Sequence, residues 1–204
     1  MKYLKSELLK QAMTSSEYRK LVQDCIANGK TTGAVQSQAL IHYTKLNAAR
    51  SRRIYKQWTP QSHLLDALLS INEPMLWLCI TEAWCGDAAY YIPMLQKLEE
   101  ASDKIELHLL LRDANPRLMD AFLTNGAKSI PKLILLRKAS LEVLGVWGPR
   151  TQKAMEYRIQ LVGQGLEPTD IAEGMQRWYL QDMGKSFDQE FAHFLASIPD
   201  QPHN

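Results

Sequence analysis

The middle of the chain alternates short apolar runs with segments of helical periodicity. The apolar runs predict strands at 75–81, 104–112, 132–138 and 141–147, and the periodic segments predict helices at 87–101, 116–125 and 150–162. Strands that alternate with helices and end in a hairpin indicate an α/β fold, in which a mixed sheet carries helices on both faces. For the helix at 116–125, Asn115 suits the N-cap, Pro116 the first helical position and Gly126 the C-terminal cap.

Both ends of the chain show helical periodicity without strand patterns. Residues 1–60 are predicted to be entirely helical, with a first repeat over 4–12, a second stripe over 18–26 and a longer helix at 35–58. A short helix is expected at 63–71. Near the C-terminus two apolar stripes return, formed by Ile171, Met175, Trp178 and Tyr179 and by Phe187, Phe191, Phe194 and Leu195. These helices are expected to pack with the N-terminal ones as a cap beside or over the sheet.

The pattern divides the chain into four parts. Residues 1–62 form a helical N-terminal extension packed on the core, 63–163 form the sheet-containing core, 164–198 form C-terminal helices, and 199–204 are a frayed tail.

The composition favours a folded protein of a reducing compartment. The chain has 204 residues and 46% hydrophobic content, enough to bury a substantial core. Three widely spaced cysteines, Cys25, Cys79 and Cys85, do not form a disulfide framework. No apolar run suits a signal peptide or a membrane span, so the predicted location is the cytoplasm and no membrane is expected as a partner.

Charge is distributed unevenly along the chain. Residues 1–60 hold 11 Lys and Arg against 3 Asp and Glu, whereas residues 61–204 hold 13 against 19. The densest basic run is Arg50-Ser51-Arg52-Arg53 with Lys56. It is interpreted as a solvated helix face, because no nucleic-acid-binding signature accompanies it, and nucleic acid is not an expected partner.

The segment Thr81-Glu82-Ala83-Trp84-Cys85-Gly86-Asp87-Ala88 stands at a junction between a strand and a helix. A cysteine there faces unpaired backbone N–H groups and the positive end of a helix dipole, which favour a thiolate. The sequence therefore marks Cys85 as the candidate reactive residue, with Asp87 in the first helical turn beside it.

Trp84-Cys85-Gly86 resembles the start of the thioredoxin motif Trp-Cys-Gly-Pro-Cys, with Asp87 in place of the proline and Ala88 in place of the second cysteine. The resemblance spans about residues 71–163. It continues in the helix proline Pro93, in Asp113-Ala114-Asn115-Pro116 and in Ser129-Ile130-Pro131. The chain is similar to a monothiol variant family of the thioredoxin-like superfamily in which Trp-Cys-Gly-Asp-Ala occurs with a later Trp-Gly-Pro-Arg, here Trp147-Gly148-Pro149-Arg150.

The resemblance implies a thioredoxin-like mixed sheet with helical N- and C-terminal extensions, and a site around Cys85. It implies a cis peptide before Pro131, close to Cys85. Catalytic roles are assigned to Cys85 and Asp87, and substrate-binding roles to Trp84, Gly86, Ile130, Pro131, Gly148 and Arg150. Cys79 occupies the position of a buried acid in thioredoxins and is a possible second thiol, although a core strand residue is the plainer interpretation.

The surroundings of Cys85 determine its expected acidity. A helix dipole favours a thiolate by about 0.3–1 kcal/mol, while a carboxylate such as Asp87 about 6 Å away opposes it by roughly 1.4 kcal/mol. Cys85 is therefore expected to be less acidic than a thioredoxin nucleophile. Its helix-start position is expected to expose it and to make it the most reactive thiol, while Cys25 and Cys79 lie in the core.

Several functions stay open at this stage. The leading hypothesis is monothiol thiol–disulfide exchange or redox sensing with protein or small-molecule thiols, because Ala88 removes the resolving thiol that a general dithiol reductase needs. The alternatives are a non-catalytic peptide-binding module with a groove beside Pro131, and a thiol enzyme that uses a small-molecule thiol and holds an anion with Arg150. The other interpretation of Arg150 is a solvated or carboxylate-paired residue. If it reaches the Cys85 surface, it is expected to offset part of the effect of Asp87 on the thiol. No cofactor is expected, and the scattered histidines and cysteines predict no metal site.

Overall fold

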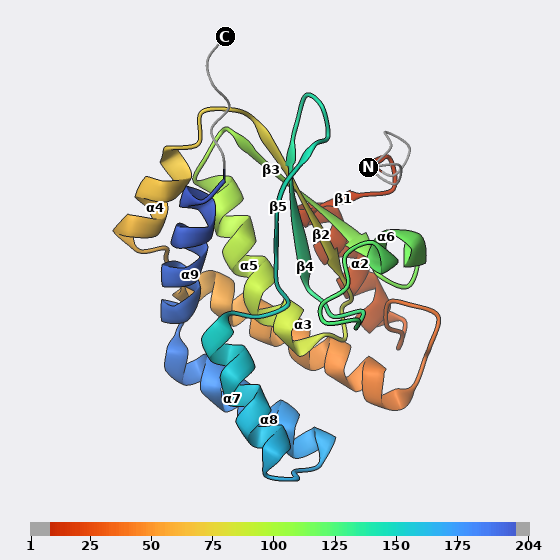
Figure 1. Ribbon diagram of the computed structural model, residues 1–204. Helices are drawn as coiled ribbons and strands as arrows, with labels where there is room; N and C mark the ends of the chain where they lie inside the picture. The colour runs from red at the N-terminus through yellow and green to blue at the C-terminus, as the bar shows by residue number, and fades with distance from the viewer. Residues whose placement is uncertain (1–8, 199–204) are drawn as a thin grey trace.

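The protein has a five-stranded sheet with the strand order β1-β3-β2-β4-β5 (Figure 1). The structure is a computed structural model that describes residues 9–198. The strands are β1 (Met13–Thr14), β2 (Met75–Thr81), β3 (Ile105–Leu111), β4 (Lys132–Arg137) and β5 (Val143–Trp147). β2 runs parallel to β3 and antiparallel to β4, and β5 returns antiparallel to β4. The predicted mixed sheet is therefore confirmed, with strand boundaries within two residues of the expected ones.

Helices surround this sheet. They are α2 (Ser15–Ala27), α3 (Gln38–Gln57), α4 (Ser62–Leu69), α5 (Gly86–Glu100), α6 (Pro116–Asp120), α7 (Gln152–Gly163), α8 (Pro168–Asp182) and α9 (Lys185–Ala196). The fold class, an α/β fold with helical extensions, is thus confirmed. The repeat expected over residues 4–12 and the tail at 199–204 lie wholly or largely outside the described residues.

The prediction that residues 1–60 contain no strand is wrong. β1 pairs antiparallel with the edge strand β3, with Met13 opposite Leu109 and Thr14 opposite His108. A two-residue strand is too short to show alternation, so only its pairing with an existing sheet edge reveals it.

The helix expected at 116–125 ends early, at Asp120. Thr124 and Ala127 exchange two backbone hydrogen bonds of 2.9 Å, and this tight turn replaces the last helical residues. Gly126, with φ of +78°, lies in that turn rather than at a helix cap. Asn115 does precede the helix, but its side-chain amide donates to the Leu111 carbonyl at 2.8 Å instead of capping.

One face of the sheet carries the aromatic core. Strand register places Trp77 of β2 and Trp147 of β5 on the same face. Phe191 of α9 packs edge-on against Trp77 at 5.5 Å between ring centroids, and Phe187 packs against Trp147 at 5.3 Å and against Tyr91 of α5 at 5.7 Å. The C-terminal helix α9 therefore closes the core beside α5, as Figure 1 shows.

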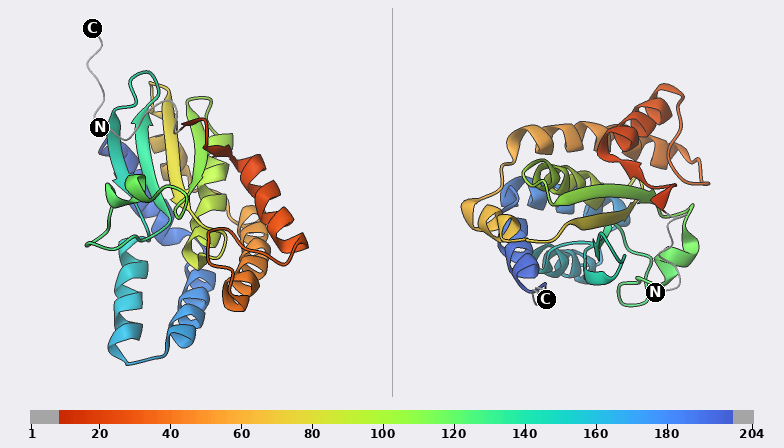
Figure 2. Two further views of the ribbon diagram at one scale, coloured as in Figure 1. Left: turned by 90° about the vertical axis from the view of Figure 1, so that its right-hand side faces the viewer. Right: turned by 90° about the horizontal axis from the view of Figure 1, so that it is seen from above.

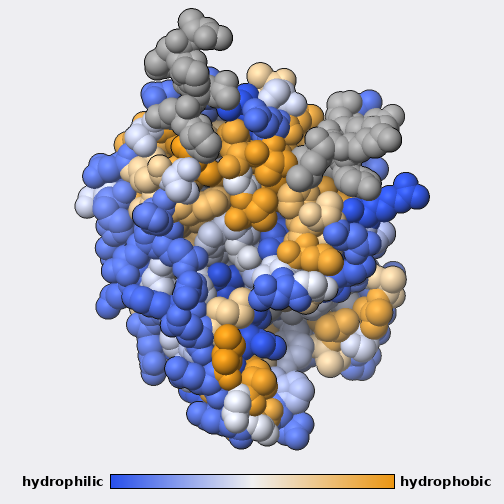
Figure 3. Space-filling model, viewed as in Figure 1, coloured by the Kyte–Doolittle hydropathy of each residue, from blue (hydrophilic) through white to orange (hydrophobic). Residues whose placement is uncertain are grey.

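The helical extensions from the two ends meet around α5. Ser51 of α3 donates to the Ala89 carbonyl of α5 at 3.0 Å. The indole of Trp58, at the end of α3, donates to Asp188 of α9 at 3.4 Å. Figure 2 shows α2 and α3 on one side of the sheet and the α7–α8 hairpin projecting beyond its end. Ile159 and Val162 of α7 are exposed. Figure 3 shows apolar surface over the hairpin.

Candidate functional site

The candidate site is the turn that joins β2 to α5. Cys85 is the N-cap residue of α5, with extended backbone angles and with its N–H donating to the Glu82 carbonyl at 3.1 Å. The turn directs the backbone N–H groups of Asp87 and Ala88 toward the Cys85 sulfur. These are the unpaired amides of a helix start, and they favour the thiolate.

The Cys85 sulfur also faces the loop that precedes β4. Its thiol donates to the Ile130 carbonyl at 3.3 Å, and the Ile130–Pro131 peptide is cis. Ile130 is buried. The structure therefore brings Cys85 beside Ile130 and Pro131, which follow it by about 45 residues in the chain.

Cys85 is buried, so the expectation that its helix-start position exposes it is wrong. Its exposed fraction is 8%, whereas Cys25 is only half-buried. Burial first, and then the Asp87 charge, raise the pKa of Cys85 to about 12, against the opposing influence of the Ala88 and Asp87 amides and of Arg150. The sequence attributes low acidity to Asp87, but burial is the larger cause. The Cys85 thiol is therefore protonated at neutral pH. Because Cys25 is only half-buried, we expect it to react first with alkylating agents.

Asp87 is held by two side chains that reach it from distant segments. The Tyr179 hydroxyl of α8 donates to one carboxylate oxygen at 2.6 Å, and the Arg150 guanidinium forms an ion pair with the other. Burial, followed by the Asp87 charge, raises the pKa of Tyr179 well above its usual value, so this hydroxyl remains a donor. Sequence reasoning missed Tyr179. Its one signal was that it is the hydroxyl-bearing member of an apolar helix stripe.

Arg150 pairs with Asp87. The sequence left two roles open for this helix-start cation, an anion site and a carboxylate-paired residue, and the ion pair with Asp87 matches the second. Its charge lowers the pKa of Cys85 and so opposes the effect of Asp87. Its Nε is buried and has no hydrogen-bond partner among residues 9–198.

Gly148 approaches the backbone before β4. A Cβ at this position would lie 2.4 Å from the Pro131 carbonyl oxygen, and its φ is +101°. The Lys132 ammonium donates to the Gly148 carbonyl at 3.1 Å. Glycine is therefore required by contact with Pro131, whereas the sequence had suggested the approach of a ligand.

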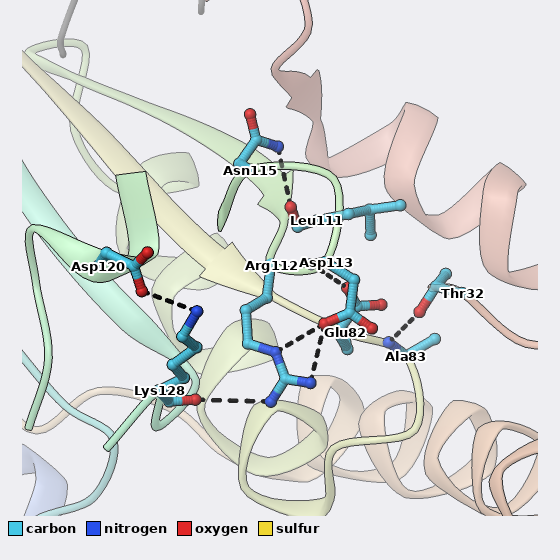
Figure 4. Close-up of polar contacts among 9 residues, drawn as sticks. All are labelled: Thr32, Glu82, Ala83, Leu111, Arg112, Asp113, Asn115, Asp120 and Lys128. Atoms are coloured by element: carbon cyan, nitrogen blue, oxygen red, sulfur yellow. Dashed lines mark hydrogen bonds and ion pairs between the residues drawn. The ribbon is translucent and has the colours of Figure 1, made fainter. Parts of the chain in front are cut away.

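A second polar cluster, in which Glu82, Arg112 and Asp113 meet (Figure 4), was not anticipated from the sequence. The half-buried Trp84 ring lies under the Arg112 guanidinium, 4.7 Å from its centroid, and Arg112 also pairs with Asp113 at 2.8 Å. The Asp113 backbone N–H donates to the Glu82 carboxylate at 2.9 Å. Glu82 is fully buried, and burial raises its pKa. This cluster fixes the turn before Cys85.

The other two thiols are Cys79, on the strand that leads to the Cys85 turn, and Cys25, on α2. Cys79 is fully buried on β2, and burial together with the neighbouring Cys85 raises its pKa. Cys25 is partly exposed on α2, so the expectation that it belongs to the core is wrong. All three cysteines are free thiols. The half-buried Gly86 lies near Gln176 of α8.

The described part of the chain offers neither a cluster of metal ligands nor a membrane-spanning helix. Between residues 9 and 198, no three His, Cys, Asp or Glu side chains gather in a way that could hold a metal ion. In that same range, no helix has the length and apolarity to cross a membrane.

The sheet and the Cys85 turn beside Pro131 define a thioredoxin-fold protein. A family model described as thioredoxin matches residues 33–162, which is well over half of the chain. The chain belongs to this thioredoxin family.

The comparison with solved structures returned two similar folds, both at 15% sequence identity. One is a 1.5 Å crystal structure of PA1234, a protein of unknown function from Pseudomonas aeruginosa, with a TM-score of 0.48 over 85% of this chain and 99% of that chain. The other is the crystal structure of an HIV epitope scaffold, with a TM-score of 0.49 over 91% of this chain and 95% of that chain. Among curated protein sequences, none matches this chain.

Proposed function

We propose that the protein carries out thiol–disulfide exchange through a single thiol, Cys85. The observation that carries the proposal is the position of the Cys85 sulfur, at the start of α5 and 3.3 Å from the Ile130 carbonyl beside Pro131. A disulfide-bearing partner laid along this segment would bring its sulfur to Cys85. Because Ala88 leaves α5 without a second thiol near its start, the reaction stops at a mixed disulfide until another thiol arrives.

The proposed reaction exchanges one disulfide for another, so each sulfur–sulfur bond that breaks is matched by one that forms. The Cys85 thiol loses its proton, the thiolate attacks one sulfur of the partner disulfide, and a new sulfur–sulfur bond forms as the old one breaks. The departing partner thiolate takes up a proton. A second thiol, from a small molecule or another protein, then loses its proton and attacks the partner sulfur of the mixed disulfide. A new disulfide forms between that thiol and the partner as the bond to Cys85 breaks, and Cys85 takes up the proton. Cys79 is proposed to act as the second thiol only when no external thiol reaches the mixed disulfide, because it is fully buried.

The residues around Cys85 are assigned roles on this basis. Asp87 adds to the effect of burial in keeping the resting thiol protonated, and Arg150 and Tyr179 hold Asp87 in place. Contact with the partner is assigned to the partly exposed Trp84, Gly86, Gly148 and Arg150 and to the backbone of the buried Ile130 and Pro131. The resting protein would then be weakly reactive, and the Arg150 charge would favour the thiolate when it forms.

A second candidate, a non-catalytic peptide-binding module, is favoured by one specific observation. Cys85 is buried, and burial with Asp87 raises its pKa to about 12, which leaves very little thiolate at neutral pH. In this function the surface around Pro131 would bind an extended peptide, and the thiol would only fill space.

Mixed-disulfide formation tests the two functions against each other. The protein is incubated with oxidised glutathione at pH 8, and the adduct is located by peptide mass spectrometry. A Cys25→Ser background removes the exposed thiol. We expect one glutathionyl group on Cys85, formed slowly and removed by added dithiothreitol, and none when Cys85→Ser is added. Adduct formation at Cys79 alone, or at no site, would leave the binding module as the better description.

Asp87→Asn should make Cys85 more reactive. Removal of the carboxylate leaves only burial to oppose Arg150 and the helix-start amides, so the pKa of Cys85 should fall by about one pH unit. Below the pKa, the thiolate fraction then rises about tenfold at a fixed pH, and the alkylation rate rises by roughly three- to fourfold, because a less basic thiolate is a weaker nucleophile. Iodoacetamide labelling at pH 8, read by mass spectrometry in the Cys25→Ser background, measures this rate.

Two variants control for structural effects of that change. Arg150→Ala should slow labelling of Cys85, because it removes the nearby positive charge. Tyr179→Phe removes one hydrogen bond and keeps the Asp87 charge, so it should alter the rate less than Asp87→Asn does. An unaltered rate in Asp87→Asn would mean that the carboxylate serves only the fold.

A further inference from the structure

A cavity lies between α2, α3 and α5, and neither Cys85 nor Ile130 lines it. It encloses about 340 Å³, within the usual range for small-molecule sites. Tyr18 and Val22 of α2, Ala48 of α3, and Ala89 and Ile92 of α5 form an apolar wall. The two helices that close it, α2 and α3, lie side by side in Figure 2.

The polar groups in the wall already have partners within the protein. The Asn47 amide donates to the Ala83 carbonyl at 3.2 Å, and its oxygen accepts from Arg50 at 3.0 Å. The Ser51 hydroxyl donates to the Ala89 carbonyl at 3.0 Å. The interior therefore offers mainly apolar surface, and a ligand body that fits it needs no hydrogen-bonding groups of its own.

The mouth of the cavity is basic. Arg19, Lys20 and Arg52 border it with exposed side chains, and no Asp or Glu of the described residues lies within ion-pair distance of them. Three acidic groups are near. Glu82 borders the cavity but is fully buried and bonded to the Asp113 N–H. Glu99 accepts from the lining residue Ser15 at 3.2 Å and from the Leu107 N–H at 2.7 Å, and Glu100 accepts from Tyr55 at the rim at 2.8 Å. The three cations therefore remain available to an anion.

We propose that this cavity binds a small amphipathic anion, an aromatic or aliphatic body carrying a carboxylate or sulfonate group. The apolar body would occupy the space between Tyr18, Ala48 and Ile92, and the anionic group would reach Arg19 and Arg52 at the mouth. The complementarity of an apolar interior with a basic rim selects this class over neutral or cationic molecules. The site does not include Cys85, and the proposal does not rest on the exchange proposed above.

Two fluorescent probes test the proposal on the full chain. The first, 1-anilinonaphthalene-8-sulfonate, has an aromatic body and a sulfonate, and the second, N-phenyl-1-naphthylamine, has the same rings without the charge. We expect saturable binding of the sulfonate at one site per chain. Arg52→Gln should weaken it about fivefold, as loss of one exposed ion pair does, and should leave binding of the uncharged probe unaffected.

Matched variants locate the binding. Arg53→Gln, one position along α3, removes an equal charge that does not border the cavity, so sulfonate binding should be retained. Ala48→Phe fills the cavity from a half-buried position, so binding of both probes should be lost while far-UV circular dichroism is retained. Absence of saturable binding, persistence of binding in a folded Ala48→Phe protein, or equal losses in Arg52→Gln and Arg53→Gln would overturn the proposal.

Discussion

Gly148→Ala is expected to destabilise the protein by about 4 kcal/mol, the sum of a backbone strain and a steric clash. The strain arises because the φ of Gly148 is +101°, which side-chain-bearing residues rarely adopt. The clash arises because the new Cβ would lie 2.4 Å from the Pro131 carbonyl oxygen, a backbone atom that has no rotamer to change. Urea unfolding followed by tryptophan fluorescence measures the loss.

Gly126→Ala separates these two contributions. Gly126 also has a positive φ, +78°, but a Cβ added there would meet no heavy atom within 4 Å. Only the backbone cost applies, so the free energy of unfolding should fall by about 1 kcal/mol. Equal losses in the two variants would show that the Pro131 contact contributes nothing. Pro131 follows Ile130, whose carbonyl accepts the hydrogen bond from the Cys85 thiol. Gly148→Ala should therefore also alter the rate of Cys85 labelling, whereas Gly126→Ala should not.

Phe187→Ala is expected to lower the free energy of unfolding by about 3–5 kcal/mol, the usual cost of emptying a buried aromatic site. Phe187 is fully buried and stacks on Phe191 at 4.7 Å. It also packs edge-on against Trp58 at 5.9 Å and Trp147 at 5.3 Å, so it joins α3, β5 and α9. We expect one cooperative unfolding transition with a lower midpoint, because α9 is part of the core.

Phe194→Ala on the same helix is the matched control. Phe194 is only half-buried, so its removal should cost about 1–2 kcal/mol. A Phe187→Ala protein that loses no more than Phe194→Ala, or one in which α9 unfolds separately before the sheet, would contradict the assignment of α9 to the core. Far-UV and near-UV circular dichroism recorded across the same urea series distinguish these cases.

Local patterns located the main strands because each follows from a short apolar run. The run at 75–81 became β2 with the predicted bounds, since a strand buried on both faces needs continuous apolar residues. The pattern failed where structure depends on a partner. β1 exists through its pairing with β3, and the helix after Pro116 yields to the turn between Thr124 and Ala127.

The candidate site was recovered in part. The motif and the resemblance named Cys85, Ile130 and Pro131, and the structure places these residues together. Arg150 was named with an anion site and a carboxylate pair both left open, and its pairing with Asp87 depends on the path of the chain after β5. Tyr179 lies 92 residues from Asp87, and the sequence pattern shows it only as part of an apolar stripe.

By itself, the sequence determined the strands β2 to β5, the helix that starts at the motif, and the absence of a second cysteine at Ala88. These depend on residue type and local spacing, which are visible without coordinates. Only the tertiary structure decided how acidic Cys85 is. Burial is the largest cause of its high pKa, and burial is produced by elements distant in the chain. The free energy of a charge depends on everything packed around it, so a motif can name a thiol without showing whether it is a thiolate.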